Sequence, residues 1–221
     1  DVTEVLASHG NNHLGGNDFD QLILERLVEE FQKNTGINLK DCHPAGYSRL
    51  RWAAEQAKRT LSTEPYAHIR EESLARADGR PLHLDMELSR DEYESMIRPL
   101  VETTLESVSS VMNDSGKKAG DIDMILLAGG STRTPLVRQM LSERTGIDIH
   151  EDIHPDYCVA LGAGLLASRL SGHDIKRVLV DISPYSFGPS YLGRKDGFEY
   201  PYCYRPIISR NTPLPVSRTE R

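Results

Sequence analysis

The sequence has few cysteines and no long hydrophobic run. Its 221 residues contain three cysteines, Cys42, Cys158 and Cys203, whose spacing fits no common metal site. An odd number of scattered cysteines is typical of reduced thiols in the cytoplasm, so we expect no disulfide framework. The longest apolar stretch, residues 159–167, falls well short of the ~18 residues that a membrane span needs. We therefore expect a cytoplasmic protein with no membrane partner.

Positive charge and recognisable catalytic motifs are also scarce. The chain has 26 Lys and Arg residues against 33 Asp and Glu, a net charge of −7, which argues against the basic face of a nucleic-acid binder. The eight histidines show no ligand spacing, so no metal site is expected. No GxxxxGK[ST] sequence occurs, which excludes a Walker A phosphate loop. No Ser/His/Asp or Cys/His arrangement identifies a catalytic residue.

The composition that is present is that of a globular protein with an internal boundary. At about 150 residues per domain, the length predicts roughly one and a half domains. Six of the twelve prolines and five of the nine tyrosines lie after residue 181. From residue 182 on, six basic residues stand against three acidic ones, a net charge of +3 that leaves −10 for the rest. This change predicts a domain boundary near residues 172–182. The chain begins without Met, as expected of a piece of a longer protein.

The order of helix and strand patterns predicts an α/β fold with a largely parallel sheet. Apolar residues at helical spacing predict helices over residues 18–34, 47–61, 89–112, 135–145 and 154–169. Strands are predicted over residues 1–8, 124–128 and 147–150, and a hairpin over 65–70 and 82–88.

Local signals refine the predicted helix ends. Asn17 or Asp18 is the expected N-cap of the first helix. Ser89 and Glu92 form a capping-box pattern, so a helix should begin there. Pro99 should kink or break that helix.

The first candidate site follows the apolar run 124–128, which is typical of a strand buried on both faces. The next segment, GGSTR, contains Gly129, Gly130, Ser131 and Arg133 and leads into a helix. Paired glycines allow a ligand to approach the backbone, and a helix N-terminus favours an anion. The same spacing also fits a simple tight connection between a strand and a helix.

Two further candidates lie earlier in the chain. One polar helix face is predicted to carry Glu55, Lys58, Arg59 and Ser62. Such a face could hold a sugar hydroxyl and stack a guanidinium on a flat base, although a solvated, salt-bridged surface has the same spacing. Gly15 and Gly16, before a helix start, could hold a phosphate or could simply form a turn before a capped helix.

The candidate segments occur in an order that resembles a known family. In sequence they read HLGGNDFD, AAEQAKRTLS, ILLAGGSTRTP, HPDYCVALGAG, KRVLVDISPYSFG and IISRNTPLP. Together they closely resemble the 70-kilodalton heat-shock chaperone family of the DnaK type, a cytoplasmic stress-response family, over nearly the whole chain.

The resemblance implies a fold and a domain order. Residues 1–171 would form the second lobe of an actin-like ATPase, a ribonuclease-H-like mixed sheet with helices plus an outer α+β subdomain. The outer subdomain would cover about 15–92, and the inner one 1–14 and 93–171. Residues 172–182 would be the interdomain linker, and residues 183–221 the truncated start of the peptide-binding β-domain.

The resemblance also implies nucleotide contacts, residue by residue. Glu55, Lys58, Arg59 and Ser62 match the family's ribose and adenine contacts, and Gly129, Gly130, Ser131 and Arg133 match the other half of that pocket. Arg59 and Arg133 would sandwich the adenine between them. Gly15 and Gly16 match the loop beside the phosphates, and Asp156 a further position at the base pocket.

The implied function is that of an ATP-dependent chaperone. ATP or ADP would be the cofactor, with Mg²⁺ bound mainly through the first lobe, which this chain lacks together with the catalytic phosphate loops. The chain alone is therefore expected not to hydrolyse ATP. Implied partners are extended client peptides, a J-domain co-chaperone and a nucleotide exchange factor. Alternatives are a non-hydrolysing ATP-binding relative that acts as an exchange factor or scaffold, and a small-molecule kinase of the actin-like superfamily.

Overall fold

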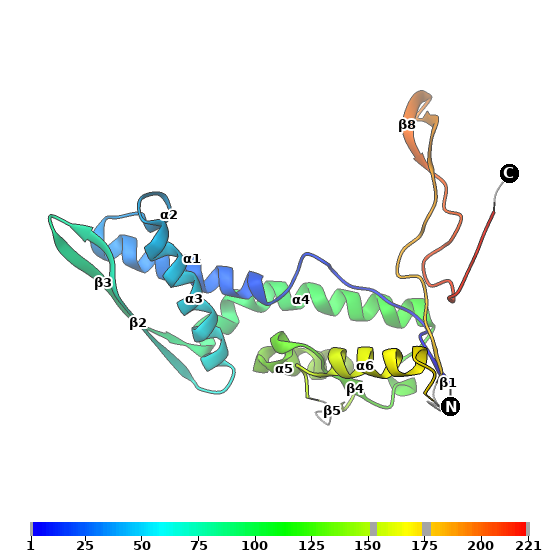
Figure 1. Cartoon of the computed structure of the whole chain (residues 1–221), viewed down its shortest axis with the longest axis horizontal. Coiled ribbons are helices and arrows are strands. Elements are labelled where there is room, and N and C mark those ends of the chain that lie inside the picture. The colour runs from blue at the N-terminus through cyan, green and yellow to red at the C-terminus, as the bar shows by residue number, and fades with distance from the viewer. Residues whose placement is uncertain (1, 151–153, 174–177, 220–221) are drawn as a thin grey trace. The chain divides into compact units, whose positions relative to one another are not determined.

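A computed structural model describes residues 2–150, 154–173 and 178–219 of the chain, which form a mixed α/β protein (Figure 1). The helices are α1 (Gly16–Thr35), α2 (Leu39–Cys42), α3 (Pro44–Leu61), α4 (Arg90–Ser115), α5 (Pro135–Thr145) and α6 (Cys158–Leu170), with 3₁₀ turns η1 (Ala119–Asp121) and η2 (Gly130–Arg133). The strands are β1 (Val2–Glu4), β2 (Tyr66–Ala77), β3 (Arg80–Ser89), β4 (Ile125–Leu126), β5 (Ile149–His150), β6 (Val178–Val180), β7 (Ser190–Lys195) and β8 (Phe198–Tyr204).

The chain divides into two compact units. The first unit consists of Asp1–Gly10, Glu106–Asp123 and Val159–Arg221, and the second of Asn11–Leu105 and Met124–Cys158. Every predicted site residue belongs to the second unit. No helix in the described ranges is both long and apolar enough to cross a membrane.

The expected parallel sheet is present only as short pairs. Within the described residues there are four two-stranded sheets, of which β1–β6 and β4–β5 are parallel and β2–β3 and β7–β8 antiparallel. The prediction of a strand over 124–128 buried on both faces was wrong. Only Ile125–Leu126 forms a strand, and Leu126 is 49% exposed, because β5 is its one neighbour among the described strands.

The predicted N-cap of α1 was also wrong. Gly15 occupies the cap position, and its backbone N–H donates to the carboxylate of Asp18 three residues later, at 2.7 Å. A carboxylate in the first turn also interacts favourably with the helix dipole, which favours this start. The helix ends at Gly36, whose left-handed φ of 74° suits glycine.

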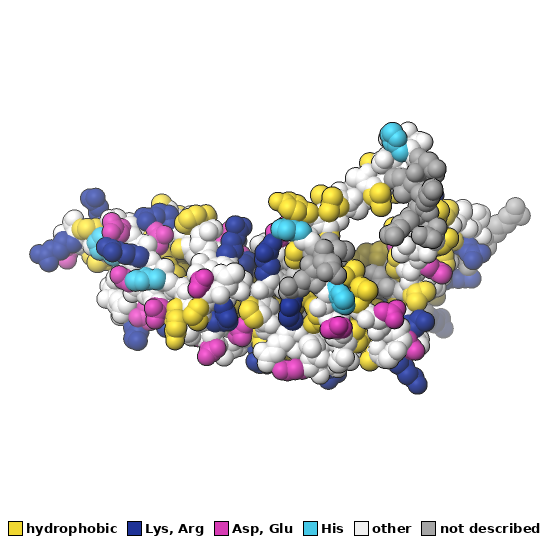
Figure 2. All heavy atoms as spheres, turned by 90° about the horizontal axis from the view of Figure 1, so that it is seen from below, with side chains coloured by type: hydrophobic (Ala, Val, Ile, Leu, Met, Phe, Trp, Pro, Cys, Tyr) yellow, Lys and Arg dark blue, Asp and Glu magenta, His cyan; other side chains and the backbone are white. Residues whose placement is uncertain are grey.

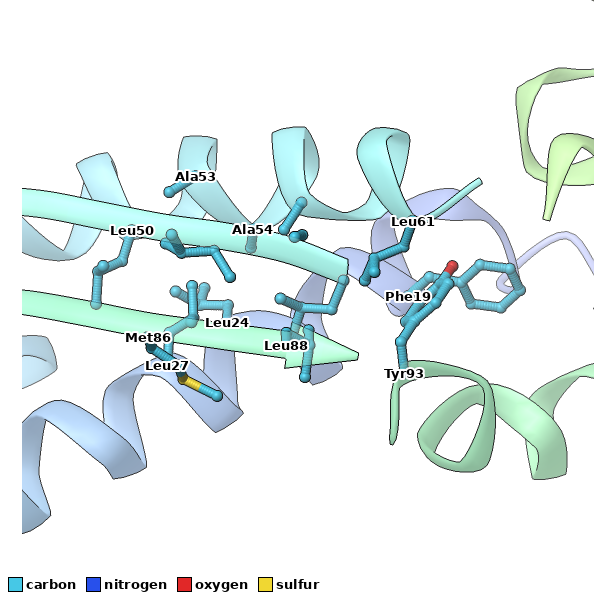
Figure 3. Close-up of a cluster of buried hydrophobic side chains, with 14 of the residues drawn as sticks. Phe19, Leu24, Leu27, Leu50, Ala53, Ala54, Leu61, Met86, Leu88 and Tyr93 are labelled. Carbon is cyan, nitrogen blue, oxygen red and sulfur yellow. The ribbon is translucent and has the colours of Figure 1, made fainter. Parts of the chain in front are cut away.

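The core of the second unit lies between α1, α3 and the β2–β3 hairpin. Figure 1 shows the hairpin beside these two helices, which contact each other and the hairpin. Their apolar sides contribute fully buried residues, among them Ile23, Leu27, Phe31, Leu50, Ala54, Leu61 and Leu88. Figure 3 shows side chains of α1, α3 and β3 meeting in this cluster. The predicted apolar stripes therefore face one another, while charges of both signs are interspersed on the surface (Figure 2).

Helix α4 does not break at Pro99. It runs continuously over Arg90–Ser115, and Ser89 accepts a hydrogen bond from the Glu92 N–H at 3.1 Å, which confirms the predicted start. Tyr93, Ile97 and Val101 are 0–1% exposed on both sides of the proline. Burial of this face compensates for the hydrogen bond that a proline removes.

In the first unit, the predicted linker contains a paired strand. β6 lies parallel to β1, with Val2 opposite Val178 and Glu4 opposite Val180. The Leu214 N–H donates to the Asp181 carbonyl at 2.8 Å, so the chain after β6 is fixed as well. Residues 174–177 of that linker lie outside the described residues.

Shortening Leu27 should destabilise the second unit. Leu27 is 0% exposed, so Leu27→Ala should lower the free energy of unfolding by about 2–5 kcal/mol, the usual cost of a cavity in a core. Val28, the next residue, is only partly buried, so Val28→Ala should cost clearly less. Urea unfolding followed by circular dichroism measures both. Equal losses would contradict the packing described.

Tyr93 should make the protein lose stability in alkali. Burial, together with the carboxylates of Asp20 and Glu94, raises the pKa of Tyr93 to about 12, although its hydrogen bond with Thr134 lowers it. The unfolded chain ionises near pH 10, so stability is complete below that pH and is lost as pH rises towards 12, by up to roughly 3 kcal/mol. Unfolding of Tyr93→Phe between pH 9 and 12 should lack this component. An identical pH profile in both proteins would refute it.

Candidate functional site

A pocket in the second unit lies between the C-terminal half of α3, the η2 turn and the segment before α6. Its volume is about 1020 Å³. Its lining comprises Glu55, Lys58, Arg59, Ser62, Thr63, Leu127, Gly130, Ser131, Thr132, Arg133, Thr134, Arg138, His150, His154, Pro155 and Asp156. The structure thus brings together eight of the eleven predicted site residues. Gly15, Gly16 and Gly129 are not part of the lining.

Helix α3 positions its polar residues because its opposite side is held in the core. Ala54, Ala57 and Leu61 are buried, which turns the face with Glu55, Lys58, Arg59 and Ser62 towards the pocket. The end of α3 is fixed by Arg90, whose side chain donates to the Leu61 carbonyl at 2.8 Å.

Each of the two predicted stacking guanidinium groups is paired with a carboxylate. Arg59 Nη2 lies 2.5 Å from Glu55 Oε1, and Arg133 Nη2 lies 2.7 Å from Asp156 Oδ2. The Arg59 and Arg133 side chains are 68% and 47% exposed, so their planar faces remain accessible to a ligand. Salt bridges so exposed contribute little to stability, but they restrict where each guanidinium lies.

The η2 turn is held by α4 and by the segment before α6. Gly129 has a φ of 89°, which suits glycine, and its N–H donates to the Pro155 carbonyl at 2.9 Å. The buried hydroxyls of Tyr93 and Thr134 lie 3.4 Å apart. The Leu136 N–H donates to the Glu94 carboxylate at 3.2 Å, so the start of α5 is also tied to α4.

Gly16 does not line the pocket, but it packs against two residues that do. The Gly16 carbonyl accepts a hydrogen bond from Lys58 Nζ at 3.0 Å. A Cβ atom at Gly16 would come within 2.9 Å of Ser131 Oγ and 3.1 Å of Lys58 Nζ. The missing side chain therefore permits α1, α3 and the η2 turn to approach one another. Gly15 occupies the N-cap position of α1.

Positive charge dominates the pocket of this acidic chain. Its lining includes Lys58, Arg59, Arg133 and Arg138 against the carboxylates Glu55 and Asp156. Such a pocket favours a planar ligand that carries negative charge. No group of three or more His, Cys, Asp or Glu residues within the described ranges could hold a metal ion.

Sequence reasoning missed several lining residues. His154 lines the pocket and its ring stacks on Tyr157, with 4.4 Å between centroids. The family resemblance assigned Asp156 to the base pocket but not His154, although both belong to the same His-Pro-Asp sequence. The position of His154 beside Asp156 could have indicated that it also lines the pocket. No sequence signal pointed to Arg138 or His150.

Comparisons with known proteins agree with the resemblance in the sequence. The family model described as "Hsp70 protein" matches residues 1–221. The chain is 39% identical to the chaperone protein DnaK of Thermotoga petrophila over 224 residues, which is 99% of this chain and 36% of that protein. It is also 39% identical to the chaperone protein DnaK of Thermosipho africanus over 223 residues, again 99% of this chain and 36% of the relative.

The chain thus spans about a third of the length of these curated relatives, 36%. The family model, by contrast, matches the full 221 residues of this chain. The chain therefore belongs to the Hsp70 family.

Proposed function

We propose that this chain supplies the adenosine-binding half of the nucleotide cleft of an ATP-dependent chaperone. The observation that carries the proposal is the pocket itself. Two guanidinium groups, each paired with a carboxylate, line the same cavity as the polar face of α3. The names of the relatives, chaperone protein DnaK, support the chaperone part of the proposal.

The pocket residues suit the parts of adenosine. A guanidinium plane stacks favourably on a flat, electron-rich base, so Arg59 and Arg133 would hold the adenine. Glu55 accepts hydrogen bonds and Lys58 donates them, which suits the two ribose hydroxyls. The absent side chain of Gly16 leaves room for Lys58 and Ser131, which both line the pocket.

The phosphate side is proposed to depend on residues outside this chain. The described residues contain no cluster of carboxylates or histidines for Mg²⁺, so this chain's own part is to bind and orient the nucleoside. Bound Mg²⁺ neutralises phosphate charge in nucleotide hydrolysis. We propose that the metal and the attacking water are positioned by the lobe that the longer relatives possess.

The proposed domain order gives the linker a role. Residues 1–171 would form the second lobe, 172–182 the linker and 183–221 the start of a peptide-binding β-domain. The pairing of β6 with β1 supports a linker that docks as a strand on this lobe. In the longer protein, docking and release of this strand would relay the nucleotide state to the domain that holds client peptides. J-domain proteins and exchange factors would act on that cycle.

Removing either guanidinium should weaken nucleotide binding. Arg59→Ala or Arg133→Ala should reduce the affinity for ADP by about 1–3 kcal/mol, because stacking and polar contacts with the base are lost. Calorimetry or ligand-observed NMR on the 221-residue chain measures this. Arg49→Ala is the matched control, since Arg49 also lies on α3 but bonds to the Glu72 carbonyl on the hairpin. Unchanged affinity in both pocket variants would rule out the sandwich.

The chain should bind adenine nucleotides without hydrolysing them. Phosphate release from ATP by the purified chain should stay at the level of buffer, and a full-length relative serves as the positive control. Turnover that disappears in Arg133→Ala would show that the chemistry lies in this chain, against the proposal.

A further inference from the structure

Lys58, the proposed ribose contact, belongs to a largely buried ion pair whose carboxylate has no part in the contacts proposed so far. Lys58 Nζ lies 2.8 Å from Asp20 Oδ1, and the two side chains are only 16% and 15% exposed. Lys58 lines the pocket, whereas Asp20 lies behind it on the second turn of α1. No motif in the sequence pointed to Asp20.

The ammonium group of Lys58 is held by two groups of α1. It donates a hydrogen bond to the Gly16 carbonyl at 3.0 Å and forms an ion pair with Asp20, whose Oδ1 atom lies 2.8 Å from Nζ. An ammonium has three donors, so donors other than the one given to Gly16 are left for a ligand in the pocket. The Gly16 carbonyl and the Asp20 carboxylate together restrict where Nζ lies. Without them, the four-carbon side chain of Lys58 would sample many rotamers.

The negative charge of Asp20 is balanced by the ammonium group of Lys58. Its Oδ1 atom is shielded from solvent. A shielded carboxylate oxygen needs a charged or donating partner, because the water it loses must be replaced. The buried Tyr93 is also near Asp20, but its hydroxyl is shared with Thr134. Asp20 and Lys58 therefore constrain each other.

Ser131 of the η2 turn and Lys58 of α3 both lie close to Gly16. A Cβ atom at Gly16 would come within 3.1 Å of Lys58 Nζ and 2.9 Å of Ser131 Oγ. The ammonium thus lies at a point where α1, α3 and the η2 turn approach closely. A shift of Lys58 changes the edge of the pocket on which a sugar would rest.

We propose that Asp20 is a positioning residue for ribose recognition, whose ion pair with Lys58 holds the ammonium group where it can donate to the ribose hydroxyls. This inference rests on the proposed adenosine site. Asp20 itself touches no ligand and acts through Lys58. Its effect is therefore specific to ligands that carry ribose hydroxyls and does not extend to stacking of the base between Arg59 and Arg133.

The test compares adenosine with 2′,3′-dideoxyadenosine, which keeps the base but lacks both hydroxyls. Asp20→Asn, nearly the same in shape but uncharged, should lower the affinity for adenosine about tenfold, the effect of one lost hydrogen bond to a charged group. Its affinity for dideoxyadenosine should stay at the wild-type value. Asp41→Asn is the matched control, because Asp41 is exposed and accepts a hydrogen bond from the nearby Asn38 side chain. Ligand-observed NMR titrations measure all six affinities.

A double-mutant cycle shows whether the effect passes through Lys58. Lys58→Met should lose adenosine affinity to a similar extent, and adding Asp20→Asn should cause no further loss. Equal adenosine affinity in wild type and Asp20→Asn overturns the proposal. So does an equal loss for both ligands, since that would be a purely structural effect. Absence of adenosine binding by the wild-type chain refutes the proposed function itself.

Loss of folding in the single variant does not prevent the test. Removing one partner leaves a buried charge, whereas removing both is better tolerated. If Asp20→Asn shows no cooperative thermal transition, the comparison becomes Asp20→Asn/Lys58→Met against Lys58→Met. Equal adenosine affinity in these two supports the proposal, and a further loss in the double variant overturns it.

Discussion

The amphipathic character of α3 is the constraint on which the rest of the site depends. One side of the helix packs Leu50, Ala54 and Leu61 against α1 and the hairpin, with none of the three exposed (Figure 3). Burial of that side fixes the rotation of the helix. The opposite side, with Glu55 and Arg59, must then face the pocket. The recognition surface is thus a geometric consequence of the hydrophobic core.

Helix α4 connects this core to the other wall of the pocket. Arg90 binds the end of α3, Tyr93 lies beside Thr134, and Glu94 holds the start of α5. Three residues in the first turns of one helix therefore relate α3 to the η2 turn. The same helix keeps its course through Pro99 because its buried face continues beyond it. These contacts of α4 help two short polar segments that are far apart in sequence to face one cavity.

Local sequence signals predicted the features that depend on nearby residues. The helical period of α3, the helix start at Ser89 and Glu92 and the bounds of α5 were all identified correctly, because each reflects local sequence preferences. Features that depend on tertiary contacts were not predicted from the sequence. The continuity of α4 through Pro99, the exposure of β4 and the pairing of Asp20 with Lys58 all require knowledge of which elements pack together.

The site shows the same division between local and long-range information. Helical spacing placed the polar residues of α3 on one face, and the GGSTR segment was placed beside a helix start. Their convergence in one pocket followed only from the resemblance to a family with a known residue order. The carboxylate partners of the two guanidinium groups also differ in whether they are near in the sequence. Glu55 lies one helical turn from Arg59, whereas Asp156 lies 23 residues from Arg133.

The central claim is that one adenosine binds between α3 and the η2 turn. A crystal structure of the chain grown with adenosine tests it most directly. The base should lie between the guanidinium planes of Arg59 and Arg133, with the ribose beside Glu55 and Lys58. Adenosine bound elsewhere on the chain, or in this pocket with its base away from both arginines, would contradict the proposed site.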